Sequence, residues 1–398
     1  MKGGAKASAS APLQISRVAA SSPEWRLLLE CANPHSDPHT FGELLHQALD
    51  WPLLLALGDE HGVLVLLSAR LRDFNDAIAP PELREQLQHW QRVQAVFSLS
   101  LTAELFRLLD QFAASGIETL AIKGPALSVR CYGDAGARQY SDLDLIVRDR
   151  DILRCTEAMI SLGHAPKIPL PAIQAGKFPG EYVFTRRDTK LLVEFHTERT
   201  FRYHPRPLRV DKLFERQVRV CFDGHDVPAL STEDELLLIC IHGAKHFWER
   251  LMWIADVTAL ISRQPVDWDR AYTVAREVEA ERMLHVGLRL AADLLQARLP
   301  AHVADELRSD SSATRLAGQI IGRLPQGNST PGSLLQRAAF RMKMRGGFWR
   351  GASYLLRLSL SPTEEDWVPG AEGKRAWLLD AAGRPFRLAR KHGRRGPA

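Results

Sequence analysis

Apolar residues recur every three or four positions over most of the chain, a spacing that predicts amphipathic helices. The spacing covers residues 25–114 and returns from about residue 231 to residue 360. Its longest run follows Pro80-Pro81, which suits the first turn of a helix, and includes Leu87, Leu101 and Leu108. Most of these residues are therefore core positions, and residues 25–114 offer no candidate chemistry.

Between residues 112 and 230 the apolar period changes to two, which predicts short strands. Two antiparallel hairpins are expected, one turning at Asp188-Thr189 and the other at Asp223-Gly224. Further strands are expected in LAIKG and SDLDLIV, with a helix between them and another over residues 149–162. The pattern predicts an α+β fold, with a small mixed sheet flanked by N- and C-terminal helical domains.

This reading divides the chain into five parts. They are a disordered leader (1–23), a helical region (24–111), an α/β domain (112–230), a second helical domain (231–360) and an irregular basic tail (361–398). The leader is small and polar, with too little apolar surface to order itself. The second helical domain has a strong start, because Thr232 and Glu235 have the spacing of a capping box.

The SDLDLIV strand carries Asp142 and Asp144 two residues apart, so both carboxylates face the same side of the sheet. Two such charges repel unless a cation lies between them, and hard divalent ions prefer carboxylate oxygens. An acidic pair on an exposed strand edge is the alternative. Glu194, flanked by Val193 and Phe195, is the candidate third ligand, and His196 shares its face.

Three converging carboxylates suit two-metal phosphoryl chemistry, in which the ions activate an acceptor hydroxyl and hold a triphosphate. Mg²⁺ or Mn²⁺ is the expected cofactor, with an NTP as substrate. The turn at Lys123-Gly124 fits the phosphate side, because glycine lets the backbone approach closely and a helix N-terminus favours anions.

A second polar set lies on the helix that follows residue 231. His242, Lys245 and His246 share one helical face, and Arg250 follows shortly after. We expect Lys245 and Arg250 to neutralise the triphosphate, with Asp256 pairing with one of them. Two alternatives remain: a zinc pair at His242 and His246, which lacks the glutamate of a metalloprotease helix, or histidines that only satisfy hydrogen bonds in a buried helix.

Charge and cysteine content narrow the class of protein. The net charge is +5, but the segment from Ala381 onward contains six basic residues and no acid, which leaves about −1 for the rest. The basic tail either contacts nucleic acid or an acidic partner, or is a solvated terminus. Five scattered cysteines without CxxC spacing indicate reduced thiols. With no signal peptide and no membrane-spanning apolar run, we expect a soluble cytoplasmic protein.

The stretch LAIKGPALSVRCYGDAGARQYSDLDLIV resembles the nucleotidyltransferase superfamily that is similar to DNA polymerase beta, and more narrowly a bacterial family of uncharacterised nucleotidyltransferases. The family pattern is matched in order by Lys123, Gly124, Tyr132, Gly133, Asp134, Arg138, Asp142 and Asp144, and later by Glu194-Phe195-His196. Glu194 departs from it, because the family more often has Asp there. Weaker likeness extends through HGAKHFWERLMWIADVTAL to SPTEEDW and GRPFRLARK near the end.

The resemblance implies metal ligands at Asp142, Asp144 and Glu194, and nucleotide-binding roles for Lys123, Gly124, Arg138, Lys245 and Arg250. His196, His242, His246 and Asp256 would support them. The implied activity is transfer of an NMP from an NTP to a hydroxyl or phosphate on a small molecule, peptide or protein. The near-neutral body makes a nucleic-acid acceptor less favoured. The alternative is a catalytically impaired module that binds a peptide or protein partner.

Overall fold

The computed structural model describes residues 20–74, 79–174, 181–198, 209–329, 333–347 and 349–353. The chain begins with four short helices: α1 (Pro23–Ala32), α2 (Pro38–Leu45), α3 (Trp51–Glu60) and α4 (Leu64–Asp73). The first three begin in the same way, with Ser22, Asp37 or Asp50 accepting hydrogen bonds from the first turn and a proline inside it. Such caps satisfy the amide groups that a helix start leaves unpaired.

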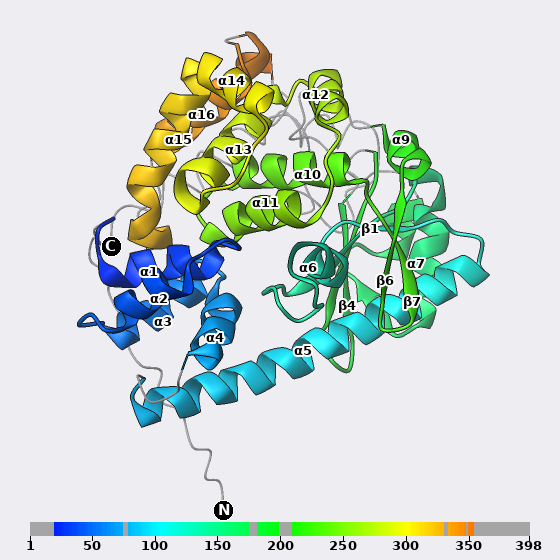
Figure 1. Cartoon of the computed structure of the whole chain (residues 1–398). Helices are drawn as coiled ribbons and strands as arrows, with labels where there is room; N and C mark the ends of the chain where they lie inside the picture. Colours follow the sequence, from blue (N-terminus) through cyan, green and yellow to red (C-terminus); the bar gives the residue numbers. More distant parts are fainter. Residues whose placement is uncertain are drawn as a thin grey trace, which may run out of the picture.

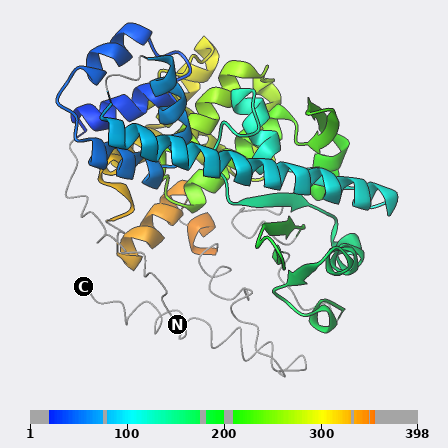
Figure 2. The same cartoon turned by 90° about the horizontal axis from the view of Figure 1, so that it is seen from below.

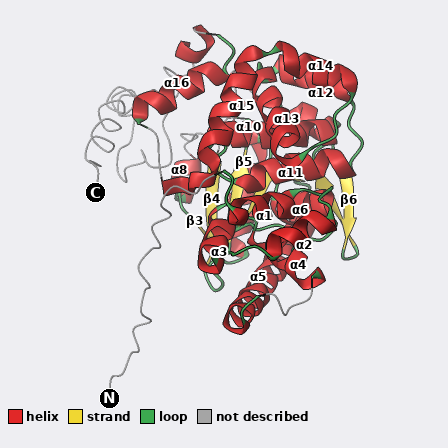
Figure 3. Cartoon of the chain, turned by 60° about the vertical axis from the view of Figure 1, so that its left-hand side comes forward, coloured by secondary structure: helices red, strands yellow, loops and turns green. Residues whose placement is uncertain are grey.

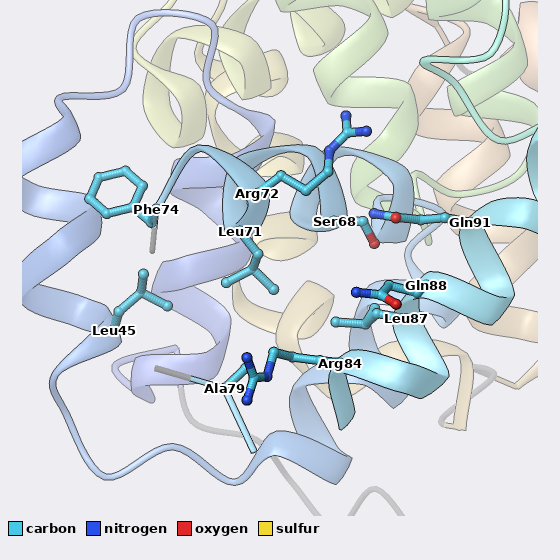
Figure 4. A pocket seen from close by; sticks show the side chains of 10 residues that line it. All are labelled: Leu45, Ser68, Leu71, Arg72, Phe74, Ala79, Arg84, Leu87, Gln88 and Gln91. Atoms are coloured by element: carbon cyan, nitrogen blue, oxygen red, sulfur yellow. The ribbon is translucent and has the colours of Figure 1, made fainter. Parts of the chain in front are cut away.

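The 34-residue helix α5 (Pro81–Ala114) connects these helices to the sheet. It runs along the lower edge of the molecule in Figure 1 and crosses most of the width of the view from below in Figure 2. Its second half buries Leu101, Leu105, Leu108 and Phe112 against the strands. Near its start, a cavity of about 150 Å³ lies between α5 and α4, surrounded by side chains that include those of Ser68, Leu71 and Leu87 (Figure 4).

Within the described residues the strands form one seven-stranded sheet in the order β3-β4-β5-β2-β1-β7-β6. Their bounds are β1 (Leu120–Ala121), β2 (Asp142–Ile146), β3 (His164–Pro166), β4 (Glu181–Arg186), β5 (Leu192–His196), β6 (Val218–Phe222) and β7 (His225–Ala229). β2 and β5 run parallel at the centre, whereas β4–β5 and β6–β7 are antiparallel. Both predicted hairpins are therefore confirmed.

Helices lie against both faces of the sheet, and Figure 3 shows the yellow strands largely covered by red helices. On one face Leu143, Leu145 and Val147 pack with α5 and α7. The alternate residues of β2 face the other way, where Ile146 belongs to the core of the terminal helices. The helices between and around the strands are α6 (Gly124–Tyr132), α7 (Ile152–Ser161), with a 3-10 turn before it (Asp149–Asp151), α8 (Leu170–Gln174) and α9 (Val210–Glu215).

The chain continues through helices that cover the second face: α10 (Thr232–Lys245), α11 (Leu251–Arg263), α12 (Trp268–Glu277), α13 (Glu281–Leu295), α14 (Ala301–Ser309), α15 (Ser311–Arg323), a 3-10 segment (Leu324–Ser329) and α16 (Leu334–Met344). They share one hydrophobic core with α1–α4, so helices from the first and last thirds of the chain pack together. The start of α10 differs from expectation. Ser231 is the cap and accepts from the amide of Asp234, whereas Glu235 turns inward to pair with Arg130.

The structure confirms the α+β class and a mixed sheet flanked by helices, while the domain limits stay a prediction. Residues 1–19 of the expected leader and the whole basic tail (361–398) lie outside the described residues. All five cysteines fall inside them and are free, as expected. Among the described helices, none is both long and apolar enough to cross a membrane.

Candidate functional site

The candidate site forms where the central parallel strands β2 and β5 lie side by side. Asp144 of β2 pairs in register with Glu194 of β5, so the two carboxylates stand next to each other on the face covered by the terminal helices. His196, two residues further along β5, places Nε2 2.7 Å from Oδ1 of Asp144 and 4.0 Å from Oε2 of Glu194. The alternation along each strand fixes this arrangement, because positions two apart share a face.

Asp144, Glu194 and His196 can each offer one ligand atom, and these atoms all lie within 4.8 Å of one another. Two carboxylates and one imidazole suit a divalent ion such as Mn²⁺, while Mg²⁺ favours the carboxylates. Asp142 shares the face of Asp144 but pairs in register with Leu192, and it is not part of this compact group. The residues present therefore fit a metal, and His196, not Asp142, belongs to the compact group.

Asp144 already has a cationic partner. Nζ of Lys123 lies 3.2 Å from Oδ2 of Asp144, and the Asp144 side chain is only 4% exposed. Burial alone would raise the pKa of Asp144, but Lys123 and the hydrogen bond from His196 hold it well below its usual value. Asp144 is therefore ionised at neutral pH, as a metal ligand must be.

The pKa values of Asp142 and Glu194 are raised, in contrast to that of Asp144. Burial and the neighbouring charge of Asp144 raise the pKa of Asp142, and the same two causes raise the pKa of Glu194 from 4.5 to about 7. Close carboxylates cannot all ionise at low cost. The cluster therefore carries more negative charge than its present partners compensate, which favours a bound cation.

Glu194→Gln should stabilise the metal-free protein at pH 8 and change it little at pH 5. The pKa of Glu194 is raised in the folded state to about 7, so the stability that its protonated form contributes is complete below about 4.5 and lost as the pH rises through 7. Glutamine stays neutral throughout. We expect the free energy of unfolding to rise by up to about 3 kcal/mol at pH 8, because each unit of pKa shift corresponds to about 1.36 kcal/mol.

Urea unfolding in EDTA at the two pH values measures this difference. Glu157→Gln, which changes an exposed glutamate on α7, is the matched control and should show no pH-dependent gain. If Glu194→Gln gains no more stability at pH 8 than at pH 5, the charge of Asp144 does not destabilise the ionised Glu194 carboxylate.

The turn into α6 carries Lys123 and Gly124. Lys123 is the N-cap residue of α6, and no side chain accepts a capping hydrogen bond from the first amides of this helix. Gly124 has φ +63°, and a Cβ there would lie 3.4 Å from the carbonyl oxygen of Asp142. The left-handed conformation and this close approach explain why glycine suits the position.

Lys245, the last residue of α10, lies near enough to the carboxylates to interact with them electrostatically, while its expected role at the triphosphate stays a prediction. Burial lowers the pKa of Lys245, while Glu181, Asp144 and Glu194 oppose the shift, so all three acids act on this lysine. The charge of Lys123 also acts on it. The two lysines therefore come from separate elements and lie at the same carboxylate cluster.

His242 and His246 form a small aromatic group with Trp253 of α11. The ring centroids of the two histidines are 4.6 Å apart. Those of His242 and His246 lie 5.2 and 5.4 Å from the Trp253 ring. Burial lowers the pKa of both, that of His246 to about 3, so both imidazoles are neutral at pH 7. Among the described residues neither belongs to a group of three potential metal ligands, so the zinc alternative gains no support.

Arg138 and Asp256 have a partnership that the sequence did not indicate. Nε of Arg138 donates to both carboxylate oxygens of Asp256, at 3.0 and 2.9 Å, and the hydroxyl of Tyr132 donates to Oδ1 at 3.0 Å. The expected pairing of Asp256 with Lys245 or Arg250 is therefore wrong. Both charges are buried, and they tie the segment before β2 to α11. A contact between Arg138 and a nucleotide stays a prediction.

Arg250 is the exposed N-cap residue of α11. Burial lowers the pKa of His246 and of His61, and the charge of Arg250 adds to both shifts. The backbone amide of Leu251 donates to Nδ1 of His61, which connects this corner to the N-terminal helices. The expected role of Arg250 at the triphosphate stays a prediction.

Glu181 is an acidic neighbour that the sequence reasoning missed. It opens β4 directly opposite His196 of β5, and its charge helps raise the pKa of Glu194. The signal was available, because a hairpin turning at Asp188-Thr189 pairs residues at equal distances from the turn. That count places Glu181 beside His196.

One comparison with known proteins matches a large part of the chain. The model of a family described as "Uncharacterised nucleotidyltransferase" matches residues 47–296. This range contains every residue discussed above at the carboxylate cluster, whereas the suggested C-terminal likeness falls outside it. No curated protein matches the chain.

Proposed function

Because the chain belongs to the uncharacterised nucleotidyltransferase family, we propose that it transfers an NMP from an NTP to a hydroxyl or phosphate group of an acceptor and releases pyrophosphate. The acceptor oxygen bonds to the α-phosphorus, the bond from this phosphorus to the pyrophosphate oxygen breaks, and a hydroxyl acceptor releases its proton to water. The observation that carries the proposal is the meeting of Asp144 and Glu194 across parallel strands, with Lys123 from the α6 turn 3.2 Å from Asp144.

Asp144, Glu194 and His196 would hold a divalent ion, with Asp142 beside them. When bound, such an ion polarises phosphate oxygens and lowers the pKa of an attacking hydroxyl. Either Mg²⁺ or Mn²⁺ is compatible with the carboxylates, and the imidazole favours Mn²⁺ somewhat. The low pKa of Asp144 supports this role, because a ligand must be deprotonated at the working pH.

Lys123 and Lys245 would neutralise the triphosphate from two separate elements. Lys123 is the N-cap residue of α6, and Lys245 is the last residue of α10. Both lie within reach of the carboxylates, so phosphate oxygens there meet positive charge in a partly desolvated place. The uncapped amides at the start of α6 would add further donors. The neutral imidazoles of His242 and His246 would complete the cover without adding charge.

The decisive test incubates the full-length protein with α-labelled ATP, GTP, CTP and UTP in turn, with Mg²⁺ or Mn²⁺ and a broad acceptor panel. We expect label transfer that requires the metal and stops on addition of EDTA. Binding of an NTP without transfer to any acceptor would support the second candidate, a binding module that has lost turnover. That candidate is favoured by Glu194 at a position where the resemblance leads us to expect Asp.

Reduced cysteines are compatible with the cytoplasmic location that we include in the proposal.

A further inference from the structure

A cavity of about 490 Å³ lies between the loop that follows α10, the end of α15 and helix α16. Its lining includes two phenylalanines and four charged residues: Phe247, Phe340, Arg323, Arg337, Lys343 and Glu249. Three of the charges are positive and one is negative. The volume falls within the range of about 300–1,000 Å³ that is usual for small-molecule sites.

The aromatic rings hold the guanidinium groups in place. Arg323 lies over the Phe340 ring at 5.2 Å, and Arg337 lies over the Phe247 ring at 5.3 Å. The two rings are themselves 5.4 Å apart. Stacking of this kind leaves the edge of a guanidinium available to two oxygens of an anion such as a carboxylate or a phosphate.

The cations lie close enough to affect one another. Burial lowers the pKa of Arg323, Glu249 opposes the shift, and the charge of Arg337 adds to it. Arginine stays protonated in spite of such shifts. An anion between the two guanidinium groups would relieve their repulsion.

The loop that forms one wall is firmly held. Phe247 and Trp248 both have left-handed backbones, with φ values of +59° and +54°. The Trp248 ring is fully buried, and a Cβ on Gly243 would come within 2.6 Å of it. Arg323 donates a hydrogen bond to the carbonyl oxygen of Phe247. A wall fixed in this way needs little reordering when a ligand binds.

The cavity and the carboxylate cluster share this loop. His246, on which the charges of Lys245 and Lys123 act, directly precedes Phe247 in the cavity wall. Arg341 bridges the two places, because it lies over the Phe247 ring at 4.9 Å and its charge acts on His246. A molecule held in the cavity therefore lies beside the proposed reaction site.

We propose that this cavity binds the anionic end, a phosphate or a carboxylate, of a small-molecule acceptor, with Arg323 and Arg337 as its partners and Phe247 and Phe340 against its apolar part. The acceptor role rests on the proposed function. The binding itself does not, and it narrows the acceptor from the three classes considered above to a charged small molecule.

Isothermal titration with inorganic phosphate, and separately with citrate, tests the binding in metal-free, low-salt buffer without nucleotide. Arg337→Gln should weaken binding about tenfold, since it removes one charge-assisted contact. Arg337→Lys should retain part of the affinity. The matched control is Arg276→Gln, which changes another arginine that lies over an aromatic ring, that of Tyr272, and it should bind as the wild type does.

The proposal would be overturned if Arg337→Gln bound the anion as tightly as the wild type does. It would also be overturned if Lys245→Gln, rather than Arg337→Gln, lost binding, because the anion would then lie at the carboxylate cluster. Binding of phosphate but not citrate would support a phosphorylated acceptor. Binding of citrate but not phosphate would support an acceptor with a carboxylate. Circular dichroism checks that Arg337→Gln is folded. Intact phosphate binding without label transfer from any NTP would contradict the proposed function and not the cavity assignment.

Discussion

Asp144→Asn should lower nucleotidyl transfer by about a thousandfold while leaving the protein folded. Asp144 is the residue that Lys123, His196 and Glu194 all approach, and it keeps its negative charge at neutral pH. Asparagine has nearly the same shape but supplies no charge to a metal, and the loss of one preorganised electrostatic contact typically costs 10²- to 10³-fold in rate. Loss of the metal itself would add to this.

Single-turnover label transfer at saturating NTP measures the effect, with Mn²⁺ titrated to separate metal binding from turnover. The matched control is Asp188→Asn, which changes an exposed carboxylate on the same sheet at the β4–β5 turn, where it pairs with Arg186. It should transfer label at the wild-type rate. Activity within tenfold of wild type for Asp144→Asn would remove Asp144 from the proposed metal ligands.

Asp256→Ala should lower the free energy of unfolding by about 3–5 kcal/mol, the usual cost of leaving one half of a buried ion pair without its partner. Asp256 is 1% exposed and Arg138 6%, so neither charge can be solvated in place. The change also leaves the Tyr132 hydroxyl without the oxygen to which it donates. Urea unfolding followed by circular dichroism measures the loss.

Two further variants show whether the loss comes from the unpaired charge. Combining Asp256→Leu with Arg138→Met removes both charges and should recover much of the stability, because well-packed apolar residues can replace a buried pair. Asp293→Ala breaks a more exposed pair with Arg289 and should cost no more than about 1 kcal/mol. If Asp256→Ala costs as little as Asp293→Ala, the buried pair does not stabilise the fold.

Local patterns account for the parts of the fold that were predicted correctly. The alternation around Asp142 and Asp144 gave a strand with one apolar face, and the two short turns gave the hairpins. The start of α10 was placed within one residue, although the cap is Ser231. That error arose because several residues there can cap a helix, and tertiary contacts decide between them: Glu235 is drawn inward by Arg130.

The site was predictable in part for the same reason. Asp144 and Glu194 could be proposed from strand alternation alone, but their separation depends on β2 and β5 being parallel neighbours in register. The partner of Asp256 could not be predicted, because Arg138 lies more than a hundred residues away in the sequence. Charge type alone did not distinguish it from Lys245 or Arg250, which lie on the same stretch of helices as Asp256.

The amino-acid sequence by itself determined which residues could carry the chemistry, because side-chain type and spacing of two or three to four are local properties of the chain. It also determined the change from helices to strands and back. The tertiary structure decided which of these residues meet. It brought His196, and not Asp142, into the compact group with Asp144 and Glu194. It also paired Arg138 with Asp256 and placed the arginines of α15 and α16 beside Phe247. Contacts of that kind depend on how distant elements pack, and no local pattern records them.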